Sequence, residues 1–140
     1  MALFHFMKIK ALKGRNQISA AFRRGKKFTS DSLIAHVRGK QQAGDIDAPQ
    51  GGERDLFVIC AVRKKQVPHA VTRNRIKRIV RESVRAYLKE YPSLPFMTLA
   101  FIWQNPMQHH SEAKSEQIKP QVYDVLNLAM QYFSVKHSKE

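Results

Sequence analysis

The sequence predicts a single α/β domain in which a small β-sheet packs against three helices. Its 140 residues fit one domain. Hydrophobic residues make up 43% of the chain, which is enough to build a buried core. Segments with strand-like alternation are also interspersed with segments of helical periodicity. No internal repeat or low-complexity tract divides the sequence, so we expect residues 1–140 to form one unit.

A short helix is predicted over residues 16–24. Asn16 can accept an amide hydrogen bond as the N-cap, and Gly25 can end the helix in the left-handed conformation. The apolar residues that recur at helical spacing are Ile18, Ala21 and Phe22.

The next segment, Phe28 to Arg38, has the alternation of one extended strand. One face carries Leu33, Ala35 and Val37, and the other carries Ser32, Ile34, His36 and Arg38. Residues 39–54 then lack periodicity and are rich in Gly, Gln and Asp, which indicates a surface loop longer than most hairpin connections. We expect segments 1–10, 39–54 and 136–140 to be mobile.

The second half of the chain alternates strands and helices. The strand from Leu56 to Val62 is apolar on both faces, as in a central strand covered on each side, and Cys60 within it is interpreted as a small buried hydrophobic side chain. The later elements are a helix over Arg73–Glu90, a strand over Phe96–Trp103, a polar loop over Asn105–Glu116 and a helix over Ile118–Ser134. The apolar stripe of the last helix consists of Ile118, Val122, Val125, Leu126, Ala129 and Phe133.

The charge balance predicts an anionic partner. Lysine and arginine number 25 against 11 aspartate and glutamate, which gives a formal net charge of +14. Nucleic acid is the first candidate, and an acidic protein or a membrane surface is the second. The single cysteine excludes an internal disulfide. Because the sequence shows neither a signal peptide nor an apolar run of roughly 20 residues, we expect a cytoplasmic protein with no membrane partner.

The helix that follows Pro68 concentrates the positive charge. On a helical projection, one arc carries Ile76, Ile79, Val80, Val84 and Tyr87. The far side carries Asn74, Lys77, Arg78, Arg81 and Arg85, with Arg73 and Arg75 at its edges. A solvated helix face is the plain alternative, but such a face normally mixes charges of both signs, and here only Glu82 offsets the cations between Arg73 and Arg85. The pattern therefore favours a surface that binds a phosphate backbone. Bases could stack on Phe22 or lie near His36, although core packing is the alternative for Phe22.

The sequence offers no set of catalytic residues. Its acids are scattered, and His109 and His110 lack a third ligand at metal-binding spacing. It also lacks a phosphate-binding glycine loop and a nucleophile elbow. We therefore predict no catalytic residue, no metal site and no small-molecule substrate in the protein itself.

The stretch from Ala70 to Glu82, with Arg73-Asn74-Arg75 followed by Ile76-Lys77-Arg78 and Arg81, resembles the protein component of bacterial ribonuclease P. The order of the other elements agrees over about residues 10–135. The resemblance implies a ribosomal protein S5 domain 2-like α/β (α+β) sandwich, with a mixed or mostly antiparallel sheet of about four strands, three helices and a left-handed crossover.

The resemblance also implies a function: removal of the 5′ leader from precursor tRNA, with the bond cleaved by a catalytic RNA subunit and by Mg²⁺ held mainly on RNA. The partners it implies are that RNA and precursor tRNA. The RNA-binding residues it implies are Lys64, Lys65, Arg73, Asn74, Arg75, Lys77, Arg78 and Arg81, to which the helical projection adds Arg85. The residues it implies for the leader cleft are Ile18, Phe22 and His36. The alternative is a non-catalytic RNA-binding module, such as a ribosome-associated or RNA-remodelling protein; a stand-alone nuclease would need an acid–base or metal site that the sequence lacks.

Overall fold

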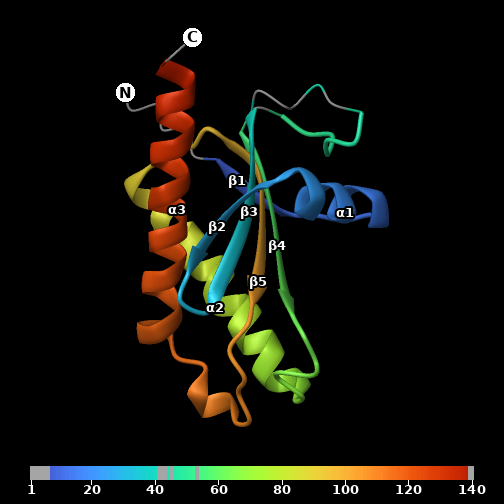
Figure 1. Cartoon of the computed structure of the whole chain (residues 1–140), viewed down its shortest axis with the longest axis vertical. Coiled ribbons are helices and arrows are strands. Elements are labelled where there is room, and N and C mark those ends of the chain that lie inside the picture. Colours follow the sequence, from blue (N-terminus) through green and yellow to red (C-terminus); the bar gives the residue numbers. More distant parts are fainter. Residues whose placement is uncertain (1–6, 41–43, 45, 53, 139–140) are drawn as a thin grey trace.

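The computed structural model describes residues 7–40, 44, 46–52 and 54–138. A five-stranded sheet separates helices α2 and α3 on one face from helix α1 on the other (Figure 1). The strands are β1 (Lys8–Ala11), β2 (Lys26–Ser30), β3 (Leu33–Gly39), β4 (Asp55–Val62) and β5 (Phe96–Trp103). The helices are α1 (Arg15–Arg24), α2 (Ala70–Glu90), α3 (Ser115–Ser138) and a 3₁₀ turn, η2 (His110–Glu112).

The sheet is mixed, with strand order β1-β4-β5-β3-β2. Strand β4 runs parallel to both of its neighbours, β1 and β5, whereas β3 runs antiparallel to β5 and to β2. Helix α2 is therefore the crossover between two adjacent parallel strands, as a parallel pair requires. The hand of this crossover stays a prediction. No helix in the described ranges is long and apolar enough to cross a membrane.

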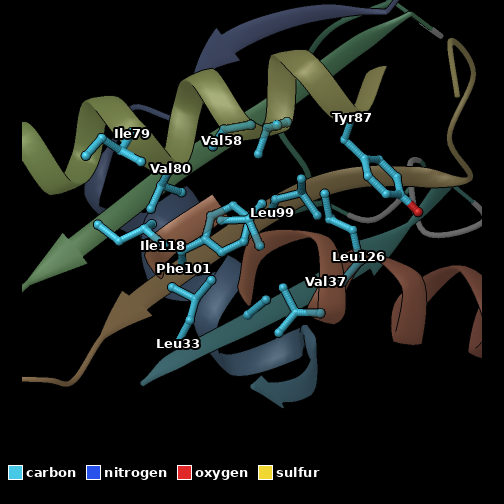
Figure 2. Packing of buried hydrophobic residues seen from close by; sticks show 14 of the residues in the cluster. Leu33, Val37, Val58, Ile79, Val80, Tyr87, Leu99, Phe101, Ile118 and Leu126 are labelled. Carbon is cyan, nitrogen blue, oxygen red and sulfur yellow. The ribbon is translucent and has the colours of Figure 1, made fainter. Parts of the chain in front are cut away.

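The main core lies between the sheet and the pair α2–α3 (Figure 2). Leu33 and Val37 from β3 and Leu99 and Phe101 from β5 point into it, because alternate strand residues share one face. The apolar stripe predicted for the last helix is confirmed, since all six of its residues are buried in this core. Cys60 is half-buried against the core, and burial raises the pKa of its thiol to about 12, so it is protonated at neutral pH.

The predictions for the two ends of the first helix were wrong. The helix begins at Arg15, so Asn16 lies within it and Gly14 is the N-cap, with no side-chain cap. Gly14 has φ of 93°, a conformation that favours glycine. Gly25 is extended rather than left-handed, with φ of −73° and ψ of 142°, because the chain passes directly from α1 into β2.

The predicted number of strands was too low. The segment 28–38 is not one strand but the antiparallel pair β2–β3, which is joined by a turn at Asp31 with φ of 48°. Segment 1–10 was expected to be mobile, but its last three residues belong to strand β1, which pairs with β4. Residues 1–6 lie outside the described part of the chain, and mobility of the loop 39–54 stays a prediction.

The later elements agree closely with the sequence. Strand β5 has the predicted bounds, whereas α2 begins three residues earlier than predicted, at Ala70 rather than Arg73. The predicted polar loop contains η2, and α3 extends beyond both predicted ends. The strand β4 has neighbours on both edges, but its α1-facing side chains Phe57 and Ile59 are only half-buried. That face of the sheet is therefore only partly covered.

Candidate nucleic-acid interface

The outer face of α2 presents a continuous basic surface. Ile76, Val80 and Val84 are buried at successive helical turns, and they hold the opposite face towards solvent. The exposed residues on this outer face include Asn74, Lys77, Arg78, Arg81 and Arg85. Among the residues that the structure describes, no ion pair involves a cation of α2. These charges are thus available to an external anion, as the sequence predicts.

Arg73 and Arg75 differ from their neighbours because both are half-buried and bonded to backbone. Arg73 Nη1 donates to the carbonyl oxygens of Val67 and Pro68, at 3.0 and 2.8 Å. Arg75 Nε donates to the carbonyl oxygen of Ala113 at 2.6 Å. Both therefore hold the loops beside the start of α2, a role that the helical projection did not show. Their contact with RNA stays a prediction.

The turn before α2 extends the basic surface. Lys64 and Lys65 are exposed there, and the backbone amides of Gln66 and Val67 both donate to the carbonyl of Arg63. The first turn of α2 has no side-chain cap. Its amides therefore add partial positive charge at the same end of the helix, which favours phosphate.

The candidate cleft residues come together on the other face of the sheet. The rings of Phe22 and His36 meet edge to face, with centroids 5.5 Å apart. Ile18 and Phe22 pack beside Phe57 and Ile59 from β4 in a small, half-exposed apolar cluster. Sequence reasoning missed these two β4 residues, although strict alternation from the core residues Leu56 and Val58 would have placed them opposite the core.

His36 lies in this cluster with its pKa lowered from the ordinary value of 6.5. Burial is the main cause, a hydrogen bond with the backbone of Gly25 acts in the opposite direction, and the charge of Lys27 lowers the pKa further. The imidazole is therefore neutral at neutral pH. A neutral ring can stack on a base and can both donate and accept a hydrogen bond.

This shift makes folding stability depend on pH. Since the folded pKa is below the unfolded one, the stabilising contribution is complete above about pH 6.5 and is lost as the pH falls through the folded pKa. When the pH is lowered from 7 to 5, the free energy of unfolding, measured with urea, should fall less in His36→Gln than in the wild type. A nuclear magnetic resonance titration of the His36 ring should give a midpoint below 6.5; a midpoint at or above that value would contradict the assignment.

The basic surface and the cleft lie on opposite faces of the sheet, so the structure does not bring all the candidate residues into one site. They approach each other at the β1–β4 side of the sheet. A cavity of about 210 Å³ there is lined by Lys77 and Arg81 from α2 and by Leu12 and Ile59 from the cleft cluster. RNA that contacts both surfaces would pass this edge.

The histidines near the start of α2 lie close together. His69, His109 and His110 line a pocket of about 290 Å³ beside Thr72. In the described part of the chain, no three His, Cys, Asp or Glu side chains are placed to hold a metal ion together. These histidines are therefore assigned no ligand.

Comparison with known proteins identifies a family. The family model described as Ribonuclease P matches residues 6–127. A ribonuclease P protein component from Chlorobium phaeobacteroides is 36% identical over 74 residues, which are 53% of this chain and 47% of that protein. One from Corynebacterium diphtheriae is 32% identical over 82 residues, which are 59% of this chain and 65% of that protein. The matches thus span about half to two thirds of the length of these relatives.

Solved structures support the same assignment at the level of fold. The Staphylococcus aureus RNase P protein structure at 2.0 Å superposes with a TM-score of 0.59 and 21% identity, covering 87% of this chain and 96% of that one. A second structure of the S. aureus protein gives a TM-score of 0.58 and 18% identity, with 93% of each chain covered. Because the family model matches most of the sequence and the fold agrees, the chain belongs to the ribonuclease P protein family.

Proposed function

We propose that this chain is the protein subunit of a ribonuclease P ribonucleoprotein, which removes the 5′ leader of precursor tRNA in the cytoplasm. The observation that carries the proposal is the outer face of α2. It exposes Asn74 of the Arg73-Asn74-Arg75 sequence and the cations of its basic continuation, in a chain that the family model matches, and no ion pair in the described residues neutralises these cations.

The α2 surface would bind the catalytic RNA. Its cations neutralise phosphates where RNA strands approach one another, and they replace part of the ion atmosphere that Mg²⁺ would otherwise supply. Lys64 and Lys65 extend this surface along the turn before the helix. The protein should therefore lower the Mg²⁺ concentration that the RNA needs.

The cleft would hold the single-stranded leader. Phe22 and neutral His36 offer ring surfaces for stacking, and Ile18, Phe57 and Ile59 supply an apolar floor. Bond cleavage belongs to the RNA subunit, with Mg²⁺ bound mainly by that RNA and the substrate. In this proposal the protein's part is to bind the RNA and the leader and to orient them.

The test is cleavage of a precursor tRNA at low Mg²⁺ by the protein alone, by a bacterial catalytic RNA alone and by both together. We expect cleavage at the mature 5′ end only in the mixture. Cleavage by the protein alone would indicate a nuclease with an active site of its own. RNA binding without any enhancement would indicate a non-catalytic RNA-binding module instead.

A further inference from the structure

Three arginines converge on one carboxylate at the end of the cleft. Arg24 Nε lies 2.7 Å from Asp47 Oδ2, Arg23 Nη2 lies 3.4 Å from the same oxygen, and Arg38 Nη2 lies 3.3 Å from Asp47 Oδ1. Arg23 and Arg24 belong to the last turn of α1, and Arg38 lies near the end of β3. Asp47 comes from the loop between β3 and β4, so three segments that are separate in the sequence meet at this carboxylate.

The cluster runs from the interior to the surface, with Arg38 buried and the side chains of Arg23 and Arg24 exposed by 60% and 44%. The side chain of Arg38 is 0% exposed, and that of Asp47 is 15% exposed. A buried guanidinium requires a nearby anion, because an uncompensated buried charge is strongly destabilising. The two carboxylate oxygens divide between the arginines of α1 and the arginine of β3.

The cluster borders the candidate stacking residues. Arg38 lies two residues after His36 on the same face of β3, and Arg23 directly follows Phe22. The backbone of a strand whose base contacts the Phe22–His36 pair would pass close to these arginines.

We propose that Arg23, Arg24 and Arg38 form a phosphodiester subsite, and that Asp47 occupies it until single-stranded RNA displaces the carboxylate. This inference rests on the proposed function. A phosphodiester, like a carboxylate, carries one negative charge and two acceptor oxygens, and guanidinium groups bind both. Exchanging one for the other keeps the charge of the site unchanged. Asp47 thus competes with RNA and weakens binding at this subsite.

The alternative role for Asp47 is that of a permanent counter-ion. The two roles predict opposite signs for Asp47→Asn, which keeps the size of the side chain but removes its charge. If Asp47 competes, the variant should bind RNA more tightly. If it only holds the arginines in place, the variant should bind RNA more weakly.

The experiment measures fluorescence anisotropy of a labelled ten-nucleotide oligouridine with the full chain at 50 and 200 mM salt. We expect Asp47→Asn to lower the Kd about fivefold at 50 mM. We also expect the salt dependence to steepen by about 0.7, the increment for one single-strand phosphate contact. The matched control is Asp31→Asn, which removes the same charge at the opposite end of β3, where φ is 48° and asparagine is tolerated. It should bind like the wild type.

Equal or weaker RNA binding by Asp47→Asn, or the same gain in Asp31→Asn, would overturn the inference. Should Asp47→Asn fail to fold, the wild type provides the test. RNA should shift the nuclear magnetic resonance signals of Arg24 Nε and Asp47 Cγ with one common Kd, and unmoved signals at saturation would refute displacement. If the wild type binds no single-stranded RNA, the proposed leader binding fails as well; if it binds and Asp47→Asn gives no gain, only this inference fails.

Discussion

Replacing Arg78 and Arg81 together by alanine is expected to weaken binding of the catalytic RNA at least tenfold and to raise the Mg²⁺ concentration needed for cleavage. Both side chains are exposed on the outer face of α2, and neither takes part in an ion pair among the described residues. Losing two duplex phosphate contacts should reduce the salt slope by about 1.8. When the salt is raised from 50 to 200 mM, RNA binding should therefore weaken by a factor that is about ten times smaller in the variant than in the wild type. Filter binding at several salt concentrations measures both quantities.

The double replacement should leave the fold intact, because alanine is the strongest helix former and the two positions are solvent-exposed. The matched control is Lys26→Ala with Lys119→Ala, which removes two exposed cations from β2 and α3. An equal effect in the control would mean that net charge, rather than the α2 surface, determines affinity. Arg73 and Arg75 provide a less specific test, since their removal also breaks hydrogen bonds to Val67, Pro68 and Ala113.

Phe101→Ala should reduce the free energy of unfolding by about 3–5 kcal/mol. Phe101 is 0% exposed on β5, and its ring lies in the core that α2 and α3 cover (Figure 2). Truncation would remove the ring's burial and leave a cavity that rigid strands on both sides cannot close. This is a large part of the 5–15 kcal/mol typical of a domain, so partial unfolding at 37 °C is expected.

Urea unfolding followed by circular dichroism measures this loss. Val71→Ala is the control, because Val71 is 68% exposed on the first turn of α2 and its truncation should change stability by no more than about 0.5 kcal/mol. A loss below about 1 kcal/mol for Phe101→Ala would contradict the packing described for β5.

The elements that were predicted best are those whose local hydrophobic pattern is enough to identify them as a helix or a strand. Strand β5 is an apolar run directly after Pro95, and the buried apolar stripe of α2 continues from Ile76 to Leu88. Strands β1 and β2 lie at the edges of the sheet, are only four and five residues long and carry exposed lysines, so their sequences give a weak strand pattern. Pairing with β4 and β3 makes them strands, and such pairing is not visible in a local pattern.

The candidate site likewise has one part that could be predicted from a local pattern and one part that could not. The basic face of α2 follows from helical periodicity, so sequence alone places Lys77, Arg78 and Arg81 on it. The cluster around Asp47 could not be predicted, because its carboxylate lies in an aperiodic loop and its arginines come from α1 and β3. Only the folded sheet brings these segments together.

The two faces of the sheet place neighbouring residues of β3 under different constraints. Leu33, Ala35 and Val37 pack in the main core, whereas His36 and Arg38 take part in the candidate RNA cleft. Evolution can therefore alter ligand preference at every second position without disturbing the interior. The same alternation makes the strand intolerant of changes in length. Inserting or deleting one residue would turn His36 inward and Val37 outward, and this would impair both folding and RNA recognition.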